Sequence, residues 1–161
     1  GQDRFVVVWQ SDGSQYSDHF ASSIRGQLLD FQGGLGDEFQ VNSYTTGGQF
    51  APAVAAFASV SYVVSWQSDL PSATDPSRGI VARCFCGGST NEFHVNTFTT
   101  GSQDLPAIAA DDAGNFVIVW QSYGSSGSDN DSASIQAQFY DALFRDGFES
   151  GGTSRLSAAL P

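Results

Sequence analysis

The amino-acid sequence predicts an all-β fold of tandem four-stranded antiparallel units that resemble the blades of a β-propeller. Three copies of one phrase carry this prediction: FVVVWQS at Phe5–Ser11, YVVSWQS at Tyr62–Ser68 and FVIVWQS at Phe116–Ser122. A repeat of this period indicates one supersecondary unit copied along the chain. No segment has an apolar period of 3.6 residues, so we expect almost no helix. The alternatives are a β-sandwich and a stacked β-solenoid.

The first strand of each unit is rich in alanine and contains a proline. It reads PAVAA within the segment Thr45–Ala56 and PAIAA within the segment Thr99–Ala110. Such small side chains fit a place where sheets crowd together, as they do at the axis of a propeller.

The second strand, which is the FVVVWQS phrase, is apolar on both faces. Phe5, Val7 and Trp9 share one face of an extended strand, and the intervening valines share the other. A half-exposed sheet would have a polar second face. We therefore expect this strand to be covered on both sides and its tryptophans to be equivalent buried core residues, namely Trp9, Trp66 and Trp120.

The third and fourth strands complete the unit. IRGQLLD at Ile24–Asp30 returns as IVARCFC and IQAQFYD, and EFQVN at Glu38–Asn42 returns as EFHVN. Clusters of Gly, Ser, Asp and Asn separate the strands, as is typical of turns. The β-repeat region therefore spans residues 1–141, in units of about 1–48, 49–102 and 103–141, and residues 142–161 form a C-terminal tail.

The units do not complete a ring. The sequence begins at a second strand and has about two and a half units, whereas propellers have about four to eight blades. A fragment of a longer chain, a ring built from several chains and an open array each fit this count. Unpaired strand edges recruit partners, and we expect assembly contacts near both ends of the chain, at Phe5, Val7, Phe144 and Phe148.

Composition restricts the partners. The chain has six arginines, no lysine and 17 acidic residues, for a net charge of −11. Nucleic acids and anionic membrane surfaces both require a basic face, so neither is expected as a partner. No apolar run of about 18 residues predicts a membrane-spanning helix. The acidic, Gly- and Ser-rich composition is typical of a soluble extracellular protein.

The two cysteines, Cys84 and Cys86, are separated by one residue. In a continuous strand they point to the same face about 6–7 Å apart, which is too far for an unstrained disulfide. We expect two small buried apolar side chains. A cystine to another chain and a metal–thiolate pair are the alternatives.

The loops that follow the second strand supply the candidate binding residues. Tyr16, Asp18 and Tyr123 are the candidates for a ligand such as a glycan. Calcium takes about six to eight oxygen ligands, which acidic loops provide. The calcium candidates are the aspartates of these loops: Asp12, Asp18, Asp69, Asp75, Asp129 and Asp131. No other cofactor is expected.

Catalysis finds little support in the sequence. Its histidines are His19 in a loop and His94 at an ordinary strand position, and no serine lies in a G-x-S-x-G motif. Active sites usually interrupt a repeat, whereas these units agree closely. We therefore expect no catalytic residues.

The repeated unit resembles that of a family of bacterial secreted repeat proteins. Its pattern is FVVVWQS, a loop, IxAQxFD and then EFxVNTxTxGxQxxPxVA, and the match covers about Phe5 to Asp141. The segment LFRDGFESGG at Leu143–Gly152 resembles the short DGFESG-type tail of exported proteobacterial proteins, with Gly152 where that tail usually has Asp. The resemblance implies an exported protein with propeller-like units and supplies no active site.

These observations predict a non-enzymatic, secreted or cell-surface protein that acts as a structural or adhesive module. We expect it to self-associate or to join other chains of the same parent protein. The alternative function is a carbohydrate-binding, lectin-like propeller completed by oligomerisation, and an enzyme is the third.

Overall fold

The computed structural model describes residues 4–13, 22–57, 61–69, 78–87, 91–124 and 132–141. These residues form β-strands and contain no helix, which confirms the predicted all-β class. Accordingly, this part of the chain has no helix that is long and apolar enough to cross a membrane. The strands are β1 (Phe5–Asp12), β2 (Ser22–Asp30), β3 (Gly33–Gly34), β4 (Phe39–Gln40), β5 (Gln49–Phe57), β6 (Ser61–Asp69), β7 (Arg78–Phe85), β8 (Glu92–His94), β9 (Gln103–Ala110), β10 (Phe116–Tyr123) and β11 (Ala133–Tyr140).

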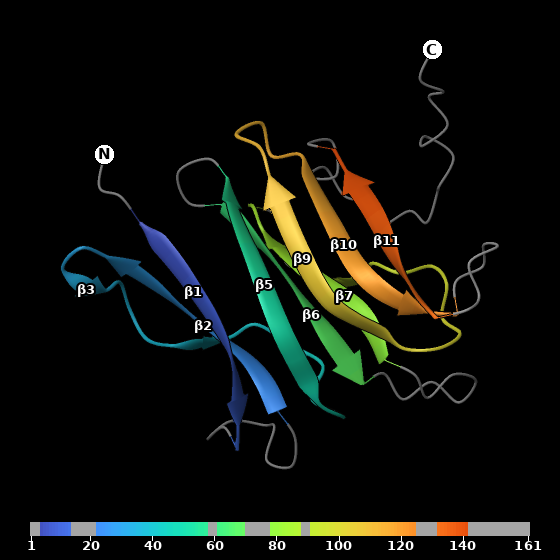
Figure 1. The fold of residues 1–161 in the computed structure, drawn as a ribbon. Helices are drawn as coiled ribbons and strands as arrows, with labels where there is room; N and C mark the ends of the chain where they lie inside the picture. The colour runs from blue at the N-terminus through green and yellow to red at the C-terminus, as the bar shows by residue number, and fades with distance from the viewer. Residues whose placement is uncertain are drawn as a thin grey trace.

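The strands form three separate antiparallel sheets (Figure 1). The second sheet has the order β5-β6-β7-β8, which is the predicted order of the four strands within one unit. The third sheet contains β9, β10 and β11, with β10 in the middle. In the first sheet β2 is central, because β1 pairs with one of its edges and both β3 and β4 pair with the other.

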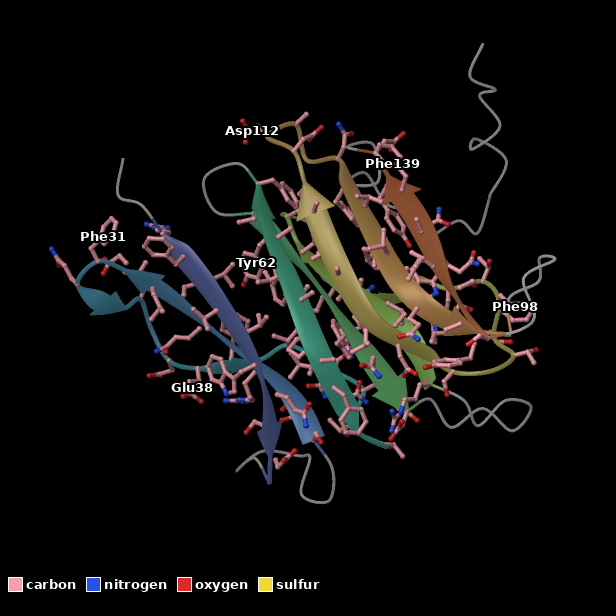
Figure 2. All side chains as sticks on the ribbon, viewed as in Figure 1. Phe31, Glu38, Tyr62, Phe98, Asp112 and Phe139 are labelled. Atoms are coloured by element: carbon pink, nitrogen blue, oxygen red, sulfur yellow. A yellow bond between two sulfur atoms is a disulfide. The ribbon has the colours of Figure 1, made fainter. Side chains whose placement is uncertain are left out.

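The sheets are stacked face to face, and the core consists of the two layers between them. Strands β1, β5 and β9 lie side by side in Figure 1. Tyr62 lies between the first and second sheets in Figure 2, together with other members of the first layer: Ile24, Val41, Val64, Trp66 and Val81. The second layer joins the second and third sheets through Phe57, Val63, Ile80, Ala82, Cys84, Val95, Phe116, Ile118 and Trp120. The stack fits both blade-like units and a layered sandwich, since no ring is closed among the described residues.

Only one of the three repeated second strands is covered on both faces. In β6 every residue from Tyr62 to Ser68 is buried. In β10 buried residues alternate with partly exposed ones, and in β1 no residue is fully buried. The expectation of two covered faces is therefore wrong for β1 and β10. The reason is that the first and third sheets each have one neighbouring sheet within the described part of the chain.

The tryptophans illustrate the same difference. Trp66 and Trp120 are 0% and 6% exposed, and each is part of the layer toward the preceding sheet. Trp9 occupies the equivalent position of β1 but is only partly buried. The prediction of three equivalent buried tryptophans is thus wrong for Trp9, because no described sheet lies against its face.

The asparagine that ends each EFxVN phrase extends the sheet with its side chain. Asn42 Oδ1 accepts a hydrogen bond from the backbone N–H of Ile24 at 2.8 Å, and Asn96 Oδ1 accepts one from Ile80 at 2.7 Å. Each Nδ2 donates to the carbonyl two residues further on, at 2.9 Å. Both asparagines are buried, so these bonds satisfy polar groups that would be costly to leave unpaired.

The glycine of each TTG phrase allows a close approach to the end of the second strand. Gly47 and Gly101 have φ angles of 82° and 78°, which favour glycine. A Cβ on Gly47 would lie 2.5 Å from the carbonyl oxygen of Asp69, and one on Gly101 would collide with the carbonyl oxygen of Tyr123. The repeated glycine therefore reflects both its φ angle and its packing.

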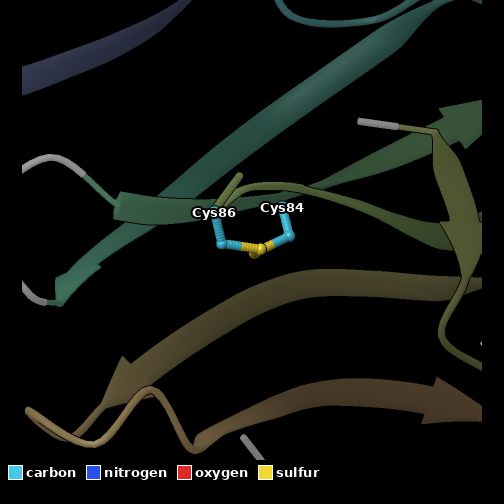
Figure 3. Close-up of a disulfide and its surroundings, with 2 residues drawn as sticks. All are labelled: Cys84 and Cys86. Atoms are coloured by element: carbon cyan, nitrogen blue, oxygen red, sulfur yellow. A yellow bond between two sulfur atoms is a disulfide. The ribbon is translucent and has the colours of Figure 1, made fainter. Parts of the chain in front are cut away.

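Cys84 and Cys86 form a disulfide (Figure 3). The prediction of two unlinked thiols is therefore wrong. It assumed a continuous strand, whereas β7 ends at Phe85 and the chain bends at Cys86, which brings the two Cα atoms to 5.4 Å. Cys84 is buried between the second and third sheets, and Cys86 packs against the same layer.

Substitution of Gly47 by alanine should destabilise the fold far more than substitution of Gly87. Both glycines have positive φ angles, but a Cβ on Gly87 would meet no atom within 4 Å. We expect Gly87→Ala to cost about 1 kcal/mol of unfolding free energy from left-handed strain alone, and Gly47→Ala about 3–4 kcal/mol because steric overlap is added. Urea denaturation would measure both values, and equal values would contradict the proposed contact with Asp69.

Candidate functional site

Strand β1 has the sequence of a central strand, that is, of a strand paired along both of its edges. In the second and third sheets the central strands β6 and β10 lie between an inner strand, β5 or β9, and a third strand, β7 or β11. Strand β1 repeats the WQS sequence of β6 and β10, yet β2 is its only pairing partner among the described residues. Its second edge is therefore open with respect to every described strand.

The inner strands are tied to the central strands by a buried glutamine. Trp66 Nε1 donates a hydrogen bond of 2.8 Å to Gln49 Oε1, and Trp120 Nε1 donates one of 2.9 Å to Gln103 Oε1. Both glutamines are essentially inaccessible to solvent. These bonds explain why a polar residue recurs inside the TTGxQxxP phrase. The repeat of this glutamine in the two TTGxQxxP phrases is the sequence signal of its role.

A β-bulge places the glutamine beside the indole. The pairing between β5 and β6 shifts register between Phe50 and Ala53, and the pairing between β9 and β10 shifts opposite Trp120. Each bulge contains a proline, and the residue before this proline has a positive φ angle. This residue is Ala51 in β5, with φ of 46°, and Leu105 in β9, with φ of 53°. Two residues of the inner strand thus lie opposite each of Trp66 and Trp120, one more than in a regular ladder. Both complete inner strands share this local geometry.

The third sheet has an open apolar face. Ile135 and Phe139 are 74% and 55% exposed. They lie opposite Gln121 and Val117 in the pairing of β10 with β11, so they share one face with these residues. The equivalent positions of the second sheet, Ile80 and Cys84, are buried against the third sheet. The open face therefore keeps the apolar character of a buried one.

The first sheet also has an open face, which points away from the second sheet at the other end of the stack. Phe5 and Val7 are 48% and 42% exposed, and Trp9 lies on the same face. Their equivalents in the second sheet are Tyr62, Val64 and Trp66, all buried against the first sheet. The predicted assembly residues Phe5 and Val7 thus lie on an exposed apolar surface. Phe144 and Phe148, which were predicted with them, lie outside the described residues.

Polar contacts connect the stacked sheets in addition to the apolar layers. Arg83 Nη1 donates to the carbonyl of Val41 at 2.6 Å, which joins the second sheet to the first. Gln67 Nε2 donates to Asp104 Oδ1 at 2.8 Å, which joins the second sheet to the third. Arg78 forms a salt bridge to Asp104 of the third sheet at 3.9 Å, in addition to one to Asp69 within its own sheet at 3.0 Å. Such contacts fix the relative orientation of sheets whose apolar packing is non-directional.

Tyrosines at the two layers are desolvated. The Tyr62 ring is stacked on Phe85 and the Tyr140 ring on Phe116, each with a centroid distance of 4.7 Å. Burial raises the pKa of Tyr62, against a smaller opposing effect of the Arg83 charge, and burial raises the pKa of Tyr140 as well. Both phenols therefore stay neutral at physiological pH.

The predicted ligand and calcium residues are placed only in part. Tyr123 is exposed at the end of β10, where its hydroxyl accepts a hydrogen bond from Gln121 Nε2 at 3.0 Å. Asp12 is exposed at the end of β1, and the carboxylate of Asp69 is engaged by Arg78. The remaining candidates lie outside the described residues: Tyr16, Asp18, Asp75, Asp129 and Asp131. The described segments contain no group of three or more His, Cys, Asp or Glu side chains suited to a metal, so glycan and calcium binding stay predictions.

The DDAGN segment forms the tight turn between β9 and β10. Asp111 accepts hydrogen bonds from the backbone and the side chain of Asn115, at 2.9 and 2.7 Å. Gly114 N–H closes the turn on the carbonyl of Asp111 at 3.0 Å. Both carboxylate oxygens of Asp111 are thus used within the turn. His94 is exposed in β8, and His19 lies outside the described residues.

Comparison with protein-family models, curated proteins and solved structures finds no match to this chain. The interpretation of the open edge and the open faces therefore depends on the chain's own internal copies. These copies show directly what covers each equivalent position in the second and third sheets.

Removal of the Gln49 carbonyl should destabilise the fold. Gln49→Leu keeps a side chain of similar size but leaves the buried indole N–H of Trp66 unpaired, and we expect a loss of about 1–3 kcal/mol of unfolding free energy. Gln10→Leu is the matched control, because Gln10 is exposed in β1 and its replacement should change stability by less than about 0.5 kcal/mol. Urea denaturation of the two variants tests the difference, and equal stabilities would show that the Trp66–Gln49 bond is not important.

The pKa of Asp111 should lie below the ordinary range of an aspartate. The side-chain hydrogen bond from Asn115 is the largest cause, followed by smaller backbone contributions. Because the folded-state pKa is lowered, ionised Asp111 stabilises the turn above the unfolded-state pKa of about 4, and this contribution disappears as the pH falls through the folded-state value. NMR titration of the Asp111 carboxyl should show that Asn115→Ala raises its pKa. An unchanged pKa in this variant would contradict the assignment.

Proposed function

We propose that this chain is a non-enzymatic, exported β-repeat protein that acts as a structural or adhesive module by self-assembly. The observation that carries the proposal is the pair of open apolar faces on the first and third sheets. Exposed apolar patches of this kind mark interaction sites in soluble proteins.

The outer face of the third sheet supports this proposal because it is not adapted to water. An antiparallel sheet with one solvated face normally alternates apolar residues with polar ones. On the open face of β10 and β11 the corresponding residues include Val117, Val119, Ile135 and Phe139. Their equivalents in the second sheet contact a neighbouring sheet, so a further sheet is the partner that best fits this face.

The open face of the first sheet has the complementary role. Within the chain, the side of the second sheet with Tyr62, Val64 and Trp66 packs against the side of the first sheet with Val6 and Val8. The face with Phe5, Val7 and Trp9 would pack in the same way against the outer face of another chain's third sheet. Such a head-to-tail contact forms a ring if its rotation closes and a filament if it does not.

The disulfide supports export. Disulfides persist in secreted and periplasmic proteins and are rare in a reducing cytosol. The Cys84–Cys86 bond and the net charge of −11 both fit a protein that acts outside the cell.

Sedimentation velocity across a concentration series should reveal reversible association of the wild-type chain. Phe139→Asp and Val7→Asp place a charge on the third-sheet face and on the first-sheet face, respectively. Each should lower the association constant by at least about tenfold, because a buried unpaired carboxylate is strongly unfavourable. Leu105→Asp is the control, since Leu105 is equally an exposed apolar residue but lies at the β9 bulge.

A mixture of the two variants tests the head-to-tail geometry. The Phe139→Asp chain keeps an intact first-sheet face, and the Val7→Asp chain keeps an intact third-sheet face. An equimolar mixture should therefore form a heterodimer that neither variant forms alone. A wild-type chain that is a monodisperse monomer at micromolar concentration would refute self-assembly, and a monomeric mixture would refute this geometry.

A further inference from the structure

We propose that the open edge of β1 is a binding site for an extended peptide segment of the type TTGxQxxPAxAA, where the variable residue between alanines is Val or Ile. The segment would pair antiparallel with β1, and its glutamine would accept a hydrogen bond from Trp9 Nε1. This site differs from the sheet faces proposed above to associate because its main contacts are backbone groups at a strand edge. Trp9, which lies on the open face of the first sheet, belongs to both surfaces.

The two complete inner strands define the register of the bound segment. Gln49 and Gln103 lie opposite Ser68 and Ser122, which correspond to Ser11 of β1. The central aliphatic residue of each inner strand also has a fixed position, because Val54 lies opposite Val64 and Ile108 lies opposite Ile118. In β1 this position is Val7. A segment of this type therefore meets on β1 a sequence, FVVVWQS, that is similar to YVVSWQS of β6 and FVIVWQS of β10.

The stacking of the sheets indicates where such a segment would lie. Strand β9 of the third sheet packs against three strands of the second sheet: β5, β6 and β7. Strand β5 occupies the corresponding place one sheet earlier and packs against β1 and β2, which are equivalent to β6 and β7. The place equivalent to β5 itself is not occupied by any described strand of the first sheet. A segment added to the first sheet at β1 would therefore contact β5 of the second sheet, in the same way that β5 contacts β9 of the third sheet.

Trp9 supplies the specific recognition. Its equivalents Trp66 and Trp120 each donate to a buried glutamine, whereas no described residue accepts from Trp9 Nε1. Strand addition at an exposed edge derives affinity from main-chain hydrogen bonds and specificity from side-chain contacts. The bulge formed by the proline would bring the glutamine of the segment beside the indole, as it does in β5 and β9.

The test is a double-mutant cycle between the protein and a synthetic peptide. The peptide has the sequence of residues 45–57, TTGGQFAPAVAAF, with a fluorescent label for anisotropy measurements. A second peptide replaces its glutamine by leucine. Both are titrated into the Phe139→Asp chain, in which the third-sheet face is blocked, and into the same chain with Trp9→Phe. Circular dichroism confirms that each protein variant is folded.

We expect the parent peptide to bind, and the glutamine-to-leucine change to weaken binding by about two- to tenfold when Trp9 is present, which corresponds to one neutral hydrogen bond. This difference should vanish in the Trp9→Phe protein, because the donor is absent. Hydrogen exchange should show new protection of the β1 amides and no change in β11. Absence of binding, an equal glutamine-to-leucine difference in both proteins, or protection at β11 in place of β1 would each overturn the inference.

The outcome is separable from that of the proposed self-assembly. A monomeric chain that binds the peptide would refute self-assembly and support the strand site. An associating chain that ignores the peptide would refute the strand site and leave self-assembly intact.

Discussion

The fold depends on the burial of β6 between two neighbouring sheets. From Tyr62 to Ser68 every residue of this strand is buried, and each of its two faces forms half of one core layer. Among the described residues no single sheet contains a core of its own, since both layers consist of residues from two sheets. Stability is therefore shared between neighbours, as in repeat proteins, where each unit is stabilised by the units on either side. Within the described residues, the first and third sheets are each stabilised by one neighbouring sheet instead of two.

Internal repetition made most of the fold predictable, because it displays the same strand in three surroundings. The β-branched and aromatic residues of FVVVWQS favour a strand, and the order of the four motifs in the second unit is the order of β5 to β8. The repeat does not reveal which copies of this strand are covered by a neighbouring sheet. Trp9 and Trp66 occur in nearly identical local sequences, and only the presence of a neighbouring sheet distinguishes a partly exposed indole from a buried one.

The candidate site was predicted less completely, and the causes are physical. Exposed apolar residues such as Phe5 and Val7 have the same residue types as buried core residues, so the sequence alone does not distinguish an open face from a covered one. The role of Gln49 and Gln103 depends on a bulge that aligns an amide with an indole, which a count of motif letters does not reveal. The Cys84–Cys86 disulfide was missed because strand geometry was extended one residue too far, past the end of β7.

The polar links between sheets bear on how precisely chains can associate. In the second sheet Gln67 donates to Asp104, an inner-strand residue of the next sheet. Gln121, on the open face of the third sheet, is the residue equivalent to Gln67. Its acceptor, equivalent to Asp104, would belong to an inner strand that pairs with β1 of another chain. The described part of the first sheet has no inner strand, so a contact between two chains would form the apolar layer without this hydrogen bond. Apolar packing alone leaves the rotation between sheets less fixed.

An inner strand with an acidic residue at the position of Asp104, bound at the β1 edge, would supply the missing acceptor. Occupancy of that edge would then restrict the angle between successive chains, which is the quantity that decides between a closed ring and a filament.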